Sequence, residues 1–300
     1  MKLYIDRLVP FFAGVILIIL LAGQLAFKNE EKQALPSHQW QAPPMPENLS
    51  FAGEAVPLDR WDVRERMDRE LMYNYYGQAN ILFLLKLSNR YFPAISERLK
   101  ANGVPDDFKY LCVAESNLLA TALSRSGAVS FWQFLDATAP EYRLTVNSEV
   151  DERYHLERAT DAACLYFKKA YQKFGSWTAA AASYNCGMGG YNGQATAQQT
   201  SNYYDLQLPE ETNRYIFRIL AFKQLLSNAE AYGYKLEDKE KYAAVPYRSL
   251  IVDSSIGNLV QFALSQGTSY KMLRQMNPWL RGRTLTVAKG KTFEVRLPEK

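Results

Sequence analysis

The segment Pro105-Asp-Asp-Phe-Lys-Tyr-Leu-Cys-Val-Ala-Glu-Ser-Asn-Leu-Leu119 has the spacing of an amphipathic helix. Its apolar residues follow the helical repeat and form one stripe, which contains Phe108, Leu111, Cys112, Leu118 and Leu119. Glu115 falls inside this stripe, seven residues after Phe108. Because burial disfavours a charged carboxylate, we expect a raised pKa for Glu115, as a general acid at neutral pH requires. From these residues alone, the alternative is a structural glutamate whose carboxylate reaches water at the edge of the helix.

The composition is that of a globular protein. Of the 300 residues, 48% are hydrophobic, which is enough for a core and two folded units. The net charge of +4 is spread along the chain without the basic stripe of nucleic-acid-binding proteins, so we expect no nucleic acid partner. Three cysteines and two histidines supply neither a disulfide framework nor metal-ligand spacing. We therefore expect no metal and no cofactor.

The N-terminus carries a long apolar segment at residues 8–27, nearly free of charge. Lys2 and Arg7 precede it and Lys28 follows it. The segment is long enough to span a bilayer, and its positive flank places the N-terminus in the cytoplasm and the rest outside. We therefore predict that residues 1–28 form a membrane anchor or, alternatively, a cleaved signal peptide. In either case the bulk of the chain is expected to be exported.

The rest of the chain divides into three parts. Residues 29–56 contain charged residues, glutamines and several prolines, and we expect them to form an extended linker. Residues 57–233 keep helical spacing with short loops, which predicts a mainly α domain. Residues 243–300 change pattern: strand-like segments at residues 250–252 and 292–297 enclose two short helical patterns. This order predicts a small β-α-α-β unit.

Two loops in the helical part carry polar residues suited to sugars. The loop at residues 121–134 contains Ser124 and Gln133, whose neutral groups can hydrogen bond to sugar hydroxyls; the alternative role is loop capping. The segment Ser183-Tyr-Asn-Cys-Gly-Met-Gly-Gly190 is a glycine-rich turn at the end of a helix. It is not a phosphate loop, because no strand precedes it and no Lys-Ser/Thr pair follows. We expect this turn to present Tyr184 and Asn185 into a cleft.

Together, these residues resemble the lytic transglycosylase family of soluble and membrane-bound enzymes, in particular its membrane-bound type D. The resemblance spans residues 57–233 and consists of several motifs in the same order. These are Glu115-Ser116, Ser124-x-Ser-Gly-Ala-x-x-x-Trp-Gln-Phe134, Val150-Asp-Glu-Arg153 with Ala159-Thr-Asp-Ala-Ala163, Ala181-Ala-Ser-Tyr-Asn-Cys-Gly187 and Glu210-Glu-Thr-Asn-Arg-Tyr215.

The resemblance implies a lysozyme-like fold of the goose-type lysozyme and transglycosylase kind. It implies a carbon-oxygen lyase on the periplasmic side of the cell envelope, acting on peptidoglycan glycan strands. The bond cleaved would be the β-1,4 bond between N-acetylmuramic acid and N-acetylglucosamine, and 1,6-anhydromuramic acid ends would form without water. Glu115 would be the single general acid/base. Substrate-binding roles would fall to Ser116, Ser124, Gln133, Tyr184, Asn185, Glu211 and Tyr215. Among these, Tyr184 would hydrogen bond near Glu115.

The chain departs from the family pattern at two places. Ser130-Phe131 stands where the family usually has Gly-Leu, so we expect Ser130 to narrow the cleft or alter a turn. Cys186 replaces a small residue, usually alanine, after Tyr184-Asn185. Neither change touches the acid itself.

The C-terminal unit resembles a LysM module, which binds glycans that contain N-acetylglucosamine. The residues that carry this resemblance are Asn258-Leu-Val-Gln-Phe-Ala263, Gly267-Thr-Ser-Tyr270, Leu273, Met276-Asn277 and Val295-x-Leu-Pro298. The entry of the module departs from the usual Gly-Asp-Thr-Leu and reads Ser254-Ser-Ile-Gly257. A packing module without a ligand is the alternative.

The sequence leaves two other functions open for the whole chain. One is a non-catalytic peptidoglycan-binding protein, which the presence of Glu115 argues against. The other is a muramidase on the same fold, because the spacing of one glutamate leaves water open as the nucleophile.

Overall fold

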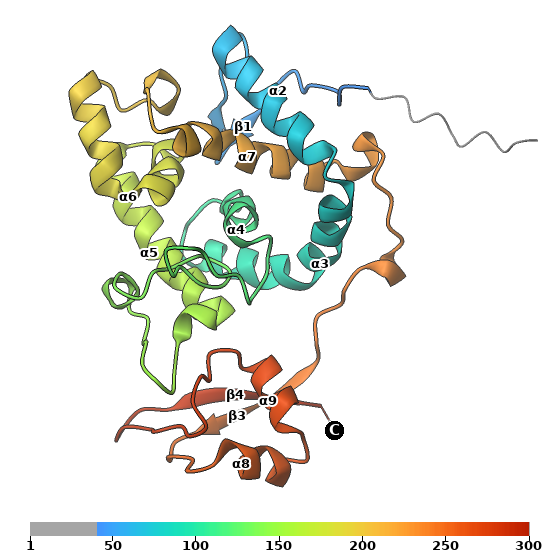
Figure 1. The fold of residues 1–300 in the computed structure, drawn as a ribbon, viewed down its shortest axis with the longest axis vertical. Helices are drawn as coiled ribbons and strands as arrows, with labels where there is room; N and C mark the ends of the chain where they lie inside the picture. The colour runs from blue at the N-terminus through green and yellow to red at the C-terminus, as the bar shows by residue number, and fades with distance from the viewer. Residues whose placement is uncertain (1–40, 300) are drawn as a thin grey trace, which may run out of the picture. The chain divides into compact units, whose positions relative to one another are not determined.

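The computed structural model describes residues 41–299, which contain a helical domain followed by a small C-terminal module (Figure 1). The helices of the helical domain are α2 (Trp61–Tyr75), α3 (Gln78–Ala101), α4 (Phe108–Ser116), α5 (Leu156–Phe174), α6 (Trp177–Gln198) and α7 (Glu210–Ser227). Short 3-10 helices lie in the loops at Ala139–Tyr142, Glu152–Tyr154, Tyr203–Asp205, Ala229–Tyr232 and Asp238–Glu240. The prediction of a mainly α protein with a small strand-containing unit is confirmed.

The predicted anchor or signal peptide at residues 1–28 lies outside the described residues. Among residues 41–299, no helix combines the length and the apolar character that crossing a membrane requires.

Helix α4 lies at the centre of the helical domain, where α3 and α7 pack against it (Figure 1). It ends earlier than the sequence pattern predicts, at Ser116, because Asn117 and Leu118 both adopt left-handed backbone angles. Leu118 is nevertheless fully buried, so the turn after the helix continues to fill the core. Left-handed angles at a bulky residue such as Leu118 are uncommon and often accompany functional sites.

The predicted linker at residues 29–56 is wrong at its C-terminal end. Residues Ser50–Phe51 (β1) and Glu54–Ala55 (β2) form a small antiparallel hairpin, and Phe51 is fully buried against the ring of Phe108 at 5.1 Å. The amide of Ala52 donates to Oδ2 of Asp107 at 2.7 Å. The segment as a whole is polar and rich in proline, which predicts a linker. The few apolar residues at its end nevertheless belong to the core of the helical domain.

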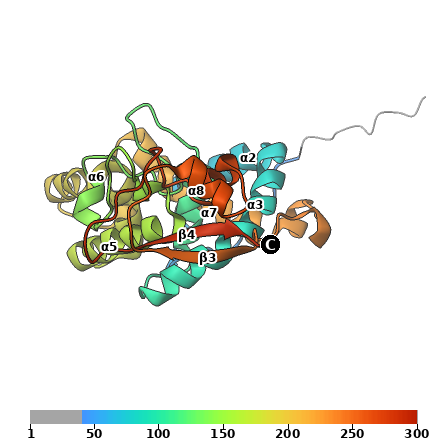
Figure 2. The same ribbon diagram turned by 90° about the horizontal axis from the view of Figure 1, so that it is seen from below.

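The C-terminal module has the predicted β-α-α-β order: β3 (Tyr247–Val252), α8 (Leu259–Ser265), α9 (Tyr270–Met276) and β4 (Phe293–Pro298). The two strands pair in antiparallel register from Tyr247 opposite Pro298 to Val252 opposite Phe293. Figure 2 shows the strands side by side. The module has its own core, which includes Leu259, Ala263, Leu273, Leu280, Leu285, Val295 and Leu297. Val150, from the loop before α5, is buried in this core as well.

Candidate active site

Glu115 occupies the next-to-last position of α4, on the face that packs into the core. The preceding residues of the stripe, Phe108, Leu111 and Cys112, are fully buried. Glu115 itself is half-buried. The helix therefore places one carboxylate where the core meets the solvent-accessible side of the domain.

The surroundings of Glu115 set its protonation. Burial raises the pKa of Glu115 to about 7, and the nearby charge of Glu211 acts in the same direction. A hydrogen bond from the hydroxyl of Tyr215 and the charge of Arg218 oppose this and lower the pKa. The predicted upward shift is confirmed. A carboxyl group with a pKa near neutrality can both donate and accept a proton at physiological pH.

One face of α7 supplies the groups that act on this carboxylate. Glu211, Tyr215 and Arg218 lie at positions i, i+4 and i+7 of the helix, which is the spacing of one helical face. Tyr215 is buried, and burial raises the pKa of its hydroxyl well above the ordinary value, so Tyr215 remains a neutral donor. Arg214 binds Oε1 of the buried Glu70 at 2.5 Å and ties α7 to α2.

Helix α6 carries Tyr184 and Asn185 just before a kink. The backbone at Gly187 has φ 75° and ψ 148°, which only glycine adopts without strain, and the helix resumes beyond it. The predicted end of the helix in this turn is therefore wrong, because the turn is a kink within α6. Asn185 accepts a hydrogen bond from the hydroxyl of Thr212 on α7 at 2.7 Å, which joins the two helices beside the site.

Tyr184 lies within electrostatic range of Glu115, but its hydroxyl does not donate to the Glu115 carboxylate. Its hydroxyl donates to the backbone oxygen of Trp132 at 2.6 Å. Burial, together with the charge of Glu115, raises the pKa of Tyr184 well above its ordinary value. The hydroxyl that binds Glu115 directly is that of Tyr215.

The loop at residues 121–134 is held by its own polar side chains. Oγ of Ser124 accepts from the amide of Ala128 at 3.0 Å, and the side-chain amide of Gln133 donates to the backbone oxygen of Ser130 at 2.8 Å. These contacts stabilise the loop itself, which is the alternative role expected for Ser124 and Gln133. Both side chains are half-buried, so a sugar-binding role for Ser124 and Gln133 stays a prediction.

Two serines differ from their expected environment. Ser116 is buried, and its hydroxyl donates back to the carbonyl of Cys112 at 3.1 Å. A substrate-binding role for Ser116 stays a prediction. Ser130 is fully buried with φ 64°, and its hydroxyl has no hydrogen-bond partner among the described residues. Of the two expected effects of Ser130, a narrowed cleft is not found, because the side chain is fully buried. The substitution instead affects a turn that favours glycine.

Arg218, Thr212 and the carbonyl of Trp132 belong to the surroundings of the site without having been predicted from the sequence. Arg218 could have been found from its position seven residues after Glu211 on the same helical face. The other two act through contacts between separate elements, which carry no local signal. Within residues 41–299, no group of three or more His, Cys, Asp or Glu side chains is placed to hold a metal ion.

Comparisons with known proteins match both parts of the chain. Residues 92–207 match the transglycosylase SLT domain, and residues 248–300 match the C-terminal LysM-like domain of soluble lytic transglycosylases. Two similar relatives are the membrane-bound lytic murein transglycosylases D of Escherichia coli strains K12 and O6:H1 (CFT073), each 27% identical over 238 residues. The match covers 77% of this chain and 52% of each relative, so the chain spans about half the length of the curated relatives it matches. The chain thus combines a transglycosylase SLT domain with a LysM-like domain of the soluble lytic transglycosylases, and it is homologous to membrane-bound lytic murein transglycosylase D.

Proposed function

We propose that this protein is a peptidoglycan lytic transglycosylase in which Glu115 is the single general acid/base. The observation that carries the proposal is the carboxyl group of Glu115, with a pKa raised to about 7 and a hydrogen bond from Tyr215. The SLT domain match and the homology to a murein transglycosylase support the same activity.

The reaction needs one group that first gives and then takes a proton. Protonated Glu115 donates its proton to the glycosidic oxygen, and the bond from the anomeric carbon of N-acetylmuramic acid to N-acetylglucosamine breaks. The 6-hydroxyl of the muramyl residue then attacks that carbon, and its proton passes to the Glu115 carboxylate. A 1,6-anhydro ring forms, no water is consumed, and Glu115 returns to its starting state. A pKa near neutrality suits both halves of this cycle.

The neighbouring residues have supporting roles in this proposal. Tyr215 fixes the orientation of the carboxylate and stabilises its charged form, since its hydroxyl donates to Oε1. Tyr184 and Asn185 join α6 to the loop and to α7 and shape the substrate site. The LysM-like domain would bind the same glycan strands. We place the protein on the periplasmic side of the cell envelope, held there by the predicted N-terminal membrane segment.

A second candidate is a muramidase on the same residues. It is favoured by Glu211, an exposed carboxylate whose charge reaches Glu115. Paired carboxylates can hydrolyse a glycosidic bond when one of them activates water. The two reactions differ by one water in the mass of the product.

The test is digestion of purified peptidoglycan with the full chain, followed by mass analysis of the released muropeptides. We expect products lighter by one water than hydrolysed ones, and a loss of activity of at least about 100-fold in Glu115→Gln. Glu230→Gln, at an exposed position outside the site, is the matched control for loss of a carboxylate. Products of full hydrolysed mass that disappear in Glu211→Gln would establish the muramidase. Undiminished release by Glu115→Gln would refute both.

A further inference from the structure

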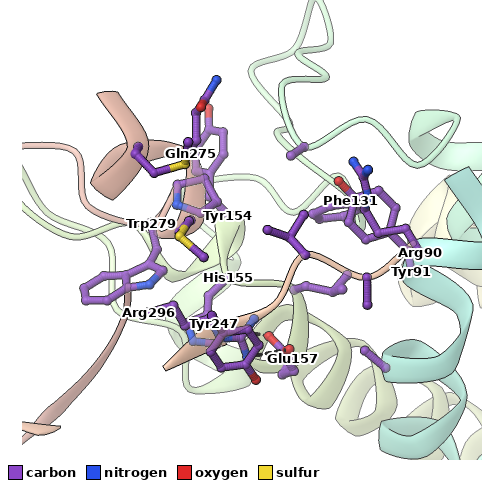
Figure 3. Close-up of a pocket in the computed structure, with 18 residues that line it drawn as sticks. Arg90, Tyr91, Phe131, Tyr154, His155, Glu157, Tyr247, Gln275, Trp279 and Arg296 are labelled. Carbon is purple, nitrogen blue, oxygen red and sulfur yellow. Dashed lines mark hydrogen bonds and ion pairs between the residues drawn. The ribbon is translucent and has the colours of Figure 1, made fainter. Parts of the chain in front are cut away.

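A cavity of about 590 Å³ lies between the helical domain and the C-terminal module (Figure 3). The helical domain contributes Tyr91, Phe131 and Tyr154, and the module contributes Met272 and Trp279. None of the candidate active-site residues lines it. A volume of this size is typical of sites for small ligands, and it is too large to be a packing defect.

The cavity has fixed walls because the loop before α5 is bound into the module. The backbone oxygen of Glu149 accepts from the amide of Arg281 at 2.6 Å, and the amide of Asp151 donates to the backbone oxygen of Trp279 at 2.8 Å. Between them, Val150 is buried in the core of the module. A site with preformed walls loses little conformational entropy when it binds a ligand.

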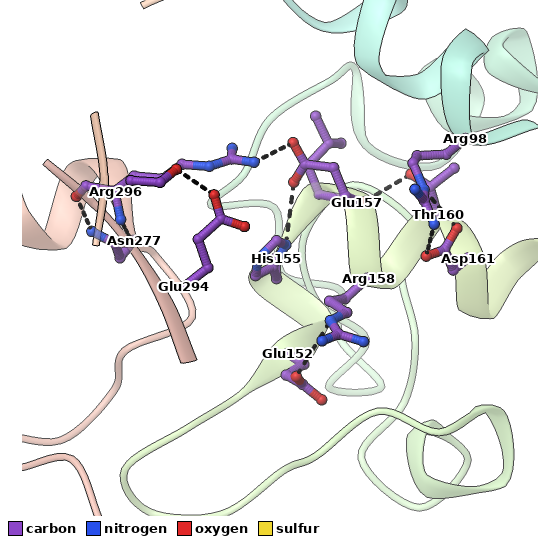
Figure 4. A network of polar contacts seen from close by, with 12 residues as sticks. Arg98, Glu152, His155, Glu157, Arg158, Thr160, Asp161, Asn277, Glu294 and Arg296 are labelled. Carbon is purple, nitrogen blue, oxygen red and sulfur yellow. Dashed lines mark hydrogen bonds and ion pairs between the residues drawn. The ribbon is translucent and has the colours of Figure 1, made fainter. Parts of the chain in front are cut away.

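Three residues of a polar network, His155, Glu157 and Arg296, line one side of the cavity. Figure 4 shows the contacts of this network. The guanidinium of Arg296 on β4 binds Oε1 of Glu157 on α5 at 2.7 Å. His155 approaches Oε2 of the same carboxylate to 3.2 Å and stacks on the ring of Trp279. Burial disfavours the charge of Glu157, but its contacts with His155 and Arg296 outweigh this effect and lower the pKa of Glu157 to about 2. The charge of Arg296 is thereby compensated.

Arg90 leaves a positive charge in the cavity. Its Nε donates to the backbone oxygen of Ala243 at 3.0 Å, and its guanidinium lies over the ring of Tyr242. Within residues 41–299, no carboxylate forms an ion pair with Arg90. An arginine held in this way favours a ligand that carries a carboxylate, because charge-assisted hydrogen bonds are the strongest that arginine makes.

The remaining lining favours small aliphatic groups over a polar sugar strand. It includes Ala94, Ala120, Val245, Met272 and Met276. Methionine side chains adapt to irregular apolar groups. A glycan would instead require several polar partners for its hydroxyls, because a buried hydroxyl without a partner is costly. The charge and the lining together fit a short peptide with small side chains and free carboxylates.

We propose that this cavity binds the stem peptide of peptidoglycan, a short chain with methyl side chains and free carboxylates. The proposal rests on the proposed function, which supplies peptidoglycan as the substrate. Phe131 gives the cavity a connection to the candidate active site. Its ring lines the cavity, its carbonyl accepts from the thiol of Cys112 on α4 at 3.4 Å, and Gln133 lies two residues further on. Peptide bound here would hold a peptide-bearing strand beside the loop next to Glu115.

The test is titration calorimetry of the full chain with the tripeptide L-Ala-γ-D-Glu-meso-diaminopimelate. Met272→Glu and Gln275→Glu each place a negative charge on an exposed part of the cavity wall and should weaken binding at least tenfold. Met72→Glu is the matched control, because Met72 is 37% exposed against 39% for Met272 and lies outside the cavity. Its affinity should equal that of the wild type. Because the two variants change separate positions, a local folding defect in one of them would not explain a loss of binding in both.

Chitotetraose serves as a peptide-free glycan probe in the same titrations. Tripeptide binding that is lost in both cavity variants and kept in Met72→Glu supports the proposal. It is overturned if the tripeptide does not bind, if it binds all variants equally, or if the cavity variants weaken chitotetraose instead. Failure of the proposed function would appear separately, as unchanged muropeptide release by Glu115→Gln, because tripeptide binding requires no bond cleavage.

Discussion

The hydroxyl of Tyr215 donates a hydrogen bond to Oε1 of Glu115, which joins two residues that lie 100 positions apart in the chain. The bond opposes the effect of the surroundings. Burial favours the neutral form of Glu115, whereas Tyr215 favours the charged form, and the resulting pKa is about 7. The contact between α4 and α7 therefore sets the pKa of Glu115 to a value at which its neutral and charged forms are both populated near neutral pH.

The raised pKa of Glu115 makes the stability of the protein depend on pH. Above the ordinary carboxyl pKa of 4.5, the unfolded chain releases this proton while the folded chain keeps it until about pH 7. The free energy of unfolding should therefore fall as pH rises from 4.5 to 7, by on the order of 1–2 kcal/mol for a half-buried group. Glu115→Gln removes this penalty, so it should be more stable than the wild type at pH 8 and equal to it near pH 4.

Denaturant unfolding at several pH values measures this difference. Glu230→Gln provides the control for loss of a surface carboxylate, and it should follow the wild type at every pH. A constant difference between Glu115→Gln and the wild type from pH 4 to pH 8 would contradict a raised pKa in the folded protein.

Tyr215→Phe should move the pH profile of the enzyme. The hydrogen bond from Tyr215 lowers the pKa of Glu115, so its loss should raise that pKa further. If protonated Glu115 is the acid, the alkaline limb of the rate profile should shift to higher pH by about one unit. Muropeptide release between pH 5 and pH 9 is the measurement.

The control for this shift is Tyr232→Phe. The hydroxyl of Tyr232 donates to the backbone oxygen of Pro44 at 3.1 Å, away from the candidate site. Its profile should keep the midpoint of the wild type. An unmoved limb in Tyr215→Phe would mean that Tyr215 does not tune the acid.

The sequence predicts those features that depend on local spacing. The stripe that contains Glu115 and the upward shift of its pKa follow from the helical repeat of one short segment. The β-α-α-β order of the C-terminal module likewise follows from patterns within each element. Helix ends were less predictable. Helix α4 ends at Asn117 and Leu118, which adopt left-handed backbone angles although neither is a glycine, the residue from which such an end is usually predicted.

Contacts between distant segments could not be read from the residues alone. The resemblance to a family placed Tyr215 in the site, but spacing could not indicate that its hydroxyl, rather than that of Tyr184, binds Glu115. Phe51 was assigned to a linker because its packing partner, Phe108, lies far along the chain. Val150 appeared to belong to the helical domain and is buried in the core of the module. In each case the deciding contact joins elements whose sequences carry no common pattern.

Ser130→Gly should stabilise the protein. Ser130 has a left-handed φ of 64°, and its buried hydroxyl has no partner among the described residues. Glycine removes the strain and the unpaired hydroxyl, and although it adds flexibility to the unfolded chain, we expect a net gain of about 1 kcal/mol. Ser130→Ala separates the causes, because it removes the hydroxyl and keeps the side chain at positive φ. Equal unfolding midpoints for the glycine variant and the wild type would show that the turn accepts serine without cost.

The ion pair between Glu157 and Arg296 should hold the two parts of the chain together in a pH-dependent way. Burial opposes the charge of Glu157, but its contacts with His155 and Arg296 hold its pKa at about 2. A carboxyl group whose folded pKa lies below its ordinary value of 4.5 adds stability above pH 4.5, and this is lost as pH falls toward 2. Glu157→Gln should therefore lower the free energy of unfolding by about 2 kcal/mol at pH 7.

The comparison with a surface pair isolates the effect of burial. Glu210→Gln breaks the contact of Glu210 with Arg69 at 2.9 Å, in which the side chains are 68% and 58% exposed. Exposed pairs contribute little, so this variant should stay within about 0.5 kcal/mol of the wild type at pH 7. The deficit of Glu157→Gln should shrink as the pH is lowered from 4.5 toward 2 and the wild type loses its charge. A deficit that stayed constant on acidification would assign the loss to packing around residue 157, because only the ion pair depends on the proton.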